Sequence, residues 1–174
     1  MAVRIRQMNI AYVPVQDRLL FRVNTTENSE YRLWFTRHFL RALWPEIVKV
    51  LSADPQIQSL DDNEQKEAVL SFKHETAVSQ SNFSRKYDDN VVQRPLGVSP
   101  LLVSTLRIKT TAPGSIILAF QNARAGGVEL SMEQNLLHSF CQLLIDTVNK
   151  AQWDLDLRIV RTAVAEYNEN RVLN

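Results

Sequence analysis

The sequence predicts an α+β protein built from two units, each of three strands followed by a helix. In each half of the chain the apolar residues first recur with period two and then with a period of about 3.6, which marks strands followed by an amphipathic helix. Residues 17–51 and 114–148 also share their apolar positions without a gap, although identities are nearly absent. We therefore predict two β-β-β-α meander-plus-helix repeats, with antiparallel sheets packed on helices and an inserted helix between them.

The chain divides into four segments of one compact domain. These are the first repeat (1–52), an inserted helix with a long polar loop (53–100), the second repeat (101–150) and a C-terminal segment expected to be helical (151–174). With 174 residues, the protein is long enough to bury roughly 70% of the surface that its unfolded chain exposes.

The first repeat is expected to hold three strands separated by short turns. Period-two alternation places the strands at residues 2–13, 18–24 and 31–36, although the phase blurs around Met8. A helical stripe follows from Phe39 to Leu51. Pro45 lies inside this stripe and predicts a kink or a restart, because proline removes a backbone donor and clashes with the preceding turn.

The second repeat is expected to follow the same plan. Its strands are predicted at 101–111, 115–121 and 128–132, before a helix from Leu136 to Val148. After it, residues 153–168 fit both a helix and a strand, and helix is favoured.

Between the repeats, residues 61–79 are expected to form a surface helix. Asp61 is its expected cap, and Glu64 completes a capping box. Its narrow apolar face is expected to include Val69 and Phe72, extended by Ala77 and Val78. The polar stretch 79–100 reads as a long loop, and loops of that length are uncommon unless they are functional or mobile.

Composition narrows the classes of function. The net charge of +1 gives no overall field that would recruit nucleic acid or an anionic membrane. A single cysteine rules out an internal disulfide and a multi-cysteine zinc site. We find no apolar run near 18 residues and no apolar block at the N-terminus, so neither a membrane span nor a signal peptide is expected. These features favour a cytoplasmic protein.

Charge is nevertheless uneven along the chain. The first 51 residues carry eight basic and four acidic side chains. On the strands of the first repeat, the face opposite the apolar one presents the candidate nucleic-acid-binding residues Arg4, Arg6, Arg22, Arg32 and Trp34. Arginines can contact phosphates while a tryptophan stacks on bases. The commoner alternative is a solvated strand face, with Trp34 packed against arginine stems or a partner sheet.

In its order of elements, the chain resembles the PUR-repeat and Whirly families of single-strand-binding proteins. The resemblance spans most of the chain and implies binding of single-stranded nucleic acid. Those families usually have four strands per repeat where three are predicted here, and the Lys-Gly-Lys type signature of Whirly proteins is missing. No residue role is carried over from them.

The sequence contains no catalytic constellation and no metal site that we can identify. Cys141 lies inside an apolar helical stripe and is expected to be a structural thiol. His38 opens the first helix without an orienting carboxylate, His74 lies on the inserted helix, and His138 is expected to face solvent. No cofactor is expected.

We therefore expect a non-catalytic interaction module that forms a homo-oligomer, with a dimer favoured, or binds another protein. Pairing of uncovered strand edges or packing of sheet faces would bury Trp34 and Leu20. One alternative is the single-stranded nucleic-acid binder described above. A second alternative is a small-ligand protein or enzyme in which the 79–100 loop acts as a lid, with Arg85, Lys86, Tyr87 and Arg94 reaching an anionic ligand.

Overall fold

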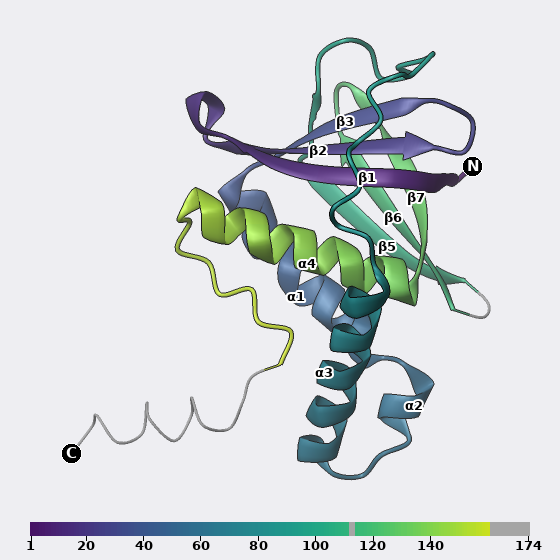
Figure 1. Ribbon diagram of the computed structural model, residues 1–174, viewed down its shortest axis with the longest axis vertical. Coiled ribbons are helices and arrows are strands. Elements are labelled where there is room, and N and C mark those ends of the chain that lie inside the picture. Colours follow the sequence, from purple (N-terminus) through teal and green to yellow (C-terminus); the bar gives the residue numbers. More distant parts are fainter. Residues whose placement is uncertain (112–113, 161–174) are drawn as a thin grey trace.

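The computed structural model describes residues 1–111 and 114–160 and confirms the α+β class (Figure 1). Within these residues, one seven-stranded sheet is accompanied by four α-helices. The strands are β1 (Val3–Val13), β2 (Arg18–Thr25), β3 (Glu30–Phe35), β4 (Leu101–Leu102), β5 (Thr105–Thr111), β6 (Ser115–Asn122) and β7 (Gly126–Glu133). The helices are α1 (Arg37–Ser52), α2 (Pro55–Gln58), α3 (Asn63–Gln80) and α4 (Gln134–Ala151).

The strands form one continuous sheet in the order β4-β3-β2-β1-β7-β6-β5, and not the separate antiparallel sheets that the sequence predicted. Neighbours within β1–β3 and within β5–β7 are antiparallel, as expected for meanders with short turns. Parallel pairs join β1 to β7 and β3 to β4. The β1–β7 pair covers only Val3 and Arg4, so the two meanders meet at a narrow seam. Periodicity reports which face of a strand is buried and carries no information about its neighbour across such a seam.

The single strand expected at residues 101–111 is wrong, because β4 and β5 lie there at opposite edges of the sheet. From Leu102 to Thr105 the chain spans at most about 11 Å. The sheet must therefore curl until its two edges meet. Backbone hydrogen bonds fasten this join: Val103 N–H donates to Trp34 O at 3.1 Å, and Ser104 N–H donates to Gln121 O at 2.9 Å.

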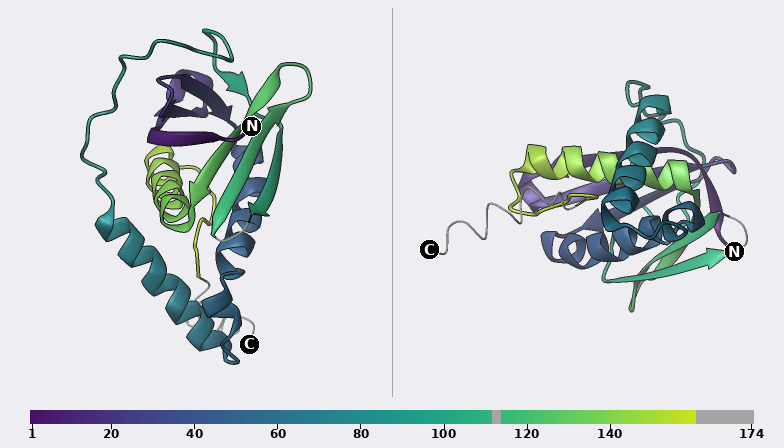
Figure 2. Two further views of the ribbon diagram at one scale, coloured as in Figure 1. Left: turned by 90° about the vertical axis from the view of Figure 1, so that its right-hand side faces the viewer. Right: turned by 90° about the horizontal axis from the view of Figure 1, so that it is seen from below.

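The inner face of the curled sheet packs against α1 and α4 (Figures 1 and 2). Four fully buried phenylalanines from β2, β3, β6 and α4 form its centre: Phe21, Phe35, Phe120 and Phe140. Their ring centroids are 5.0 Å apart for the β2–α4 pair and 5.3 Å apart for the β3–β6 pair. The predicted alternation therefore placed the core residues of both halves on the correct face.

Helix α1 begins where the Thr36 hydroxyl accepts a hydrogen bond from the Phe39 N–H at 3.1 Å, which is an N-cap. Of the two outcomes predicted at Pro45, a kink or a restart, the restart is wrong, since α1 runs through this residue as one element. Pro45 lies on the exposed face of α1, where water can satisfy the carbonyl that loses its helical partner.

Helix α3 projects away from the sheet and packs against α4 (Figure 1). Asp62, and not Asp61, caps it by accepting a hydrogen bond from the Glu64 N–H. The expected apolar face is only partly correct, because Phe72 is 68% exposed whereas Leu70 and Ala77 are buried. With so few buried residues, α3 depends on polar contacts to α4 for its position.

After α4, residues 152–160 contain neither helix nor strand. The helix expected over 153–168 is therefore wrong over residues 153–160, and its remainder lies outside the described residues. Gln152 adopts a left-handed conformation (φ 54°) that ends α4. Trp153 and Leu157 nevertheless pack onto the core from this irregular segment.

Candidate functional site

The strands of the first half present two distinct faces, as the alternation predicted. The inner face holds fully buried residues of β2 such as Leu19 and Phe21. On the outer face, Arg22 of β2 lies directly opposite Arg32 of β3. Two like charges in opposite positions of an antiparallel pair destabilise a sheet unless anions neutralise them.

Residues 81–100, which we call the strap, supply the anion for Arg22, whereas Arg32 lies near Glu30 of its own strand. The strap runs from the end of α3 across β1 to β3 and returns to the sheet at β4 (Figure 1). Its Asp88 carboxylate accepts a hydrogen bond from Arg6 at 2.8 Å, and its Asp89 carboxylate accepts one from Arg22 at 2.7 Å. Hydrogen bonds from the Asn90 N–H and from Arg6 hold the pKa of Asp88 below its usual value.

A buried cluster anchors the strap to the sheet. The Tyr87 hydroxyl donates to Asn24 Oδ1 at 2.7 Å and lies 3.3 Å from a carboxylate oxygen of Glu30. Glu30 is buried and also accepts a hydrogen bond from Arg94 at 2.9 Å. Burial, together with the Glu30 charge, raises the pKa of Tyr87, and the Arg22 guanidinium lies 4.2 Å from the centre of its ring.

The five residues proposed for nucleic-acid binding are thus not a free cationic surface. The guanidinium groups of Arg6 and Arg22 are already ion-paired to the strap. Arg32 lies 3.8 Å from Glu30, and its Nε and Nη2 atoms are buried without a hydrogen-bond partner, so they cannot reach a phosphate. Arg4 is exposed at the distant seam with β7, and Trp34 lies at a different level of β3.

Trp34 instead belongs to a row of apolar side chains across four neighbouring strands. The sheet register aligns Ala11 of β1, Leu20 of β2, Trp34 of β3 and Leu102 of β4 on the outer face. Neighbouring strands are about 4.8 Å apart, so the row is about 14 Å wide. Ala11 and Leu102 are exposed, and Leu20 and Trp34 are partly buried. We call this surface the apolar row.

The residues proposed as a ligand lid do not converge on one site. Arg85 and Tyr87 line a cavity of about 280 Å³ between β1, α4 and the first part of the strap. Lys86 contributes its backbone carbonyl to Gln7, at 2.8 Å, while Arg94 is bound to Glu30. The strap is therefore fastened to the sheet by its middle residues, and the 280 Å³ cavity lies under its beginning.

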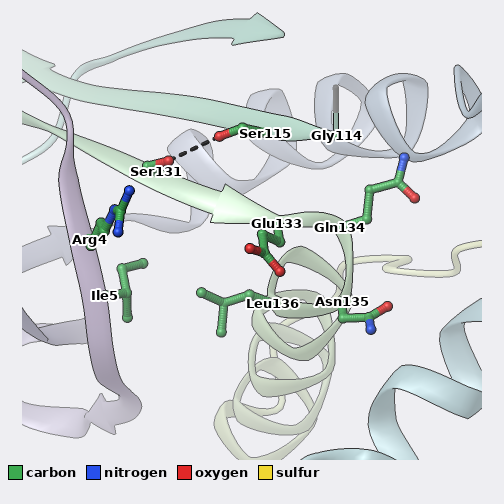
Figure 3. A pocket seen from close by; sticks show the side chains of 9 residues that line it. All are labelled: Arg4, Ile5, Gly114, Ser115, Ser131, Glu133, Gln134, Asn135 and Leu136. Carbon is green, nitrogen blue, oxygen red and sulfur yellow. Dashed lines mark hydrogen bonds between the residues drawn. The ribbon is translucent and has the colours of Figure 1, made fainter. Parts of the chain in front are cut away.

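A larger hollow of about 800 Å³ opens where β1 and β7 separate (Figure 3). Arg4 approaches it from β1 and Glu133 from the end of β7, while Leu136 of α4 points toward Ile5 across it. The hydroxyls of Ser115 and Ser131 lie 3.1 Å apart along its wall. Arg4 and Glu133 are not paired with each other within the described residues.

The expectation that His138 faces solvent is wrong, because it is buried at 2% exposure between α3 and α4. Its Nδ1 lies 3.2 Å from Nδ1 of His74, and His74 Nε2 lies 3.0 Å from Gln142 Oε1. The Gln142 amide nitrogen donates to Asp146, which points the amide oxygen at His74. The amide orientation therefore indicates that His74 Nε2–H donates to Gln142 Oε1, while the donor between the two Nδ1 atoms depends on the tautomers of the two rings.

The Nδ1 atoms of His74 and His138 face one another directly. They lie 3.2 Å apart while the ring centroids lie 5.3 Å apart, so the two rings extend away from the contact in opposite directions. That geometry suits a hydrogen bond, whereas two imidazoles that share a metal ion point toward a third position. Across residues 1–111 and 114–160, no group of three or more His, Cys, Asp or Glu side chains is placed to hold a metal ion.

Cys141 is fully buried, as expected, and burial raises the pKa of its thiol. In the same described part of the chain, no helix combines the length and apolar character needed to cross a membrane.

Comparison with protein-family models, curated proteins and solved structures finds no match.

Proposed function

We propose that the protein is a non-catalytic interaction module that self-associates through the apolar row. The observation that supports this most strongly is the position of Trp34 at the middle of that row. Its side chain is partly exposed. Within the described residues, the indole N–H groups of Trp44 and Trp153 each donate a hydrogen bond, whereas none is found for the indole N–H of Trp34. A tryptophan with an apolar body and a free donor is typical of interface centres.

The charges around the row favour a protein surface over a phosphate backbone. Arg22 is paired with the strap, and Arg18 is the outer-face cation beside Leu20 that has no ion pair within the described residues. Binding to nucleic acid depends on several unpaired cations that release counterions from phosphates. An apolar centre with a polar rim is the usual anatomy of a protein interface.

Sedimentation velocity over a wide range of protein concentration tests the proposal. The wild type is expected to shift from monomer to dimer, and Trp34→Thr and Leu102→Thr are each expected to weaken the dimer. Loss of a central aromatic anchor costs about 2 kcal/mol or more, or about thirtyfold in Kd. Val15→Thr is the matched control, because Val15 is 93% exposed on the β1–β2 connection away from the row. A wild type that stays monomeric at the highest concentration contradicts the proposal.

We also propose that the two halves derive from one duplicated unit. The shared element order, three strands and a helix, supports this, as do the matched inner positions of β2 and β6. Duplication would leave the inner faces alike and let the outer faces diverge, so that one carries the apolar row. A cytoplasmic location remains a prediction from the sequence.

A further inference from the structure

Among the described residues, strand β1 has an edge that pairs with no other strand over most of its length. It pairs with β2 from Ile5 to Val13, but with β7 only at Val3 and Arg4. Beyond that point β7 ends at Glu133 and the chain turns into α4. Among the described residues, the one hydrogen bond from α4 to the β1 backbone joins the Thr147 hydroxyl to Ile10 O at a long 3.5 Å.

The two cavities described above lie end to end along this edge. Arg4 and Ile5 line the 800 Å³ hollow, Arg6 to Asn9 line the 280 Å³ cavity, and Leu136 lines both. Six consecutive residues of one strand therefore line one or the other of two adjoining cavities. Gln7, Met8 and Asn9 follow the bulge and line the same cavity, whereas a sheet face would present alternate residues only, so this cavity lies along the strand edge. Six residues of extended chain span about 20 Å.

The walls of this edge groove combine apolar and cationic groups. Leu136 and Leu143 of α4 and Phe83 of the strap supply apolar surface, and Met8 adds to it from β1. Arg85 lies at the mouth, with no side-chain partner found for its guanidinium within the described residues. Arg4 is likewise unpaired at the other end, where Glu133 is the one acidic residue of the lining.

We propose that the edge groove binds an extended peptide segment of another protein, with alternating acidic and apolar residues, as an added strand on β1. Backbone groups of the peptide pair with the free edge, as in other cases of strand addition. Successive side chains of a strand point to opposite sides, so the apolar ones meet the leucines of α4 while the acidic ones meet Arg4 and Arg85. The apolar row lies at the far end of β1 and is a separate surface.

A fluorescein-labelled peptide of sequence Asp-Val-Glu-Leu-Asp-Val-Glu-Leu tests this site by fluorescence anisotropy on the full chain. Saturable binding is expected, with shifted and slowly exchanging amide signals for residues 5–9 in NMR spectra. Arg85→Glu is expected to weaken binding about tenfold, because it replaces an attractive rim charge by a repulsive one. Arg124→Glu is the matched control, since Arg124 is an exposed cation on the β6–β7 turn, outside the groove.

Two peptide variants sharpen the test. A peptide N-methylated at alternate residues loses backbone donors and is expected not to bind, and a lysine-for-acid peptide is expected to bind much more weakly. Equal binding of the lysine peptide, an undiminished affinity of Arg85→Glu, or amide changes at β5 in place of β1 would each overturn the proposal. Trp34→Thr is expected to leave peptide affinity unchanged, so a failure of self-association is distinguishable from a failure of this site.

Discussion

Replacing His138 with glutamine is expected to remove most of the acid sensitivity of the fold between pH 6.5 and pH 4. Burial lowers the pKa of His138 from 6.5 to about 4, and the charges of His74 and Lys73 act in the same direction while Asp54 opposes them. The unfolded chain therefore binds this proton first as pH falls, and stability decreases until both states are protonated near pH 4. At about 1.4 kcal/mol per pKa unit, the loss amounts to about 3 kcal/mol.

Urea denaturation at a series of pH values measures this loss. A glutamine at position 138 can still donate a hydrogen bond to His74 Nδ1 but does not titrate, so the His138→Gln variant is expected to lose much less stability between pH 6.5 and pH 4. The matched control is His38→Gln, because His38 is exposed at the start of α1. Parallel pH profiles for wild type and His138→Gln would refute the assignment of acid sensitivity to this histidine pair.

Three further outcomes are expected. Cys141 should resist alkylation at mildly alkaline pH in the native protein and react once urea unfolds it, whereas rapid native labelling would contradict its burial. Phe21→Ala should lower the free energy of unfolding by about 3–5 kcal/mol in chemical denaturation, and a loss below 1 kcal/mol would contradict its central packing. Asp88→Asn combined with Asp89→Asn should increase salt-sensitive binding to a fluorescent oligothymidine, because it frees two paired arginines; unchanged binding would show that the strap does not mask them.

The sequence was most informative where burial alternates along a strand. The inner and outer residues of β2 and β3 were assigned correctly because one face packs on the core and the other does not. Even the blurred phase near Met8 has a structural cause, since the register of β1 against β2 shifts between Ile5 and Gln7. A bulge places successive side chains on the same face and interrupts the period.

The contacts of the strap could not be predicted from local patterns. Asp88 and Asp89 lie in the stretch that was expected to be a long polar loop, and their partners Arg6 and Arg22 lie more than 60 positions away. One signal was present: residues 52–99 carry eight acidic and five basic side chains, opposite in sign to the basic first repeat. Charge complementarity between segments suggests such an association but does not fix its register.

The histidine pair was missed for a similar reason. His138 aligns with Arg41 of the first repeat, which favours a solvent-facing position, and local patterns do not indicate that α3 packs there. Helix α3 has a weak apolar face, with Phe72 exposed, so periodicity carried little information about its orientation. Two imidazoles and an amide form polar contacts there beside the few buried apolar side chains of α3.

The indole N–H signals of the three tryptophans in NMR spectra give the most direct test of self-association through the apolar row. Trp44 and Trp153 donate to Arg158 O and to Asp17 within the chain, so they serve as internal references. On dilution, the Trp34 signal is predicted to move while the other two stay in place. Three signals that are all independent of concentration would contradict the assignment of this face as an interface.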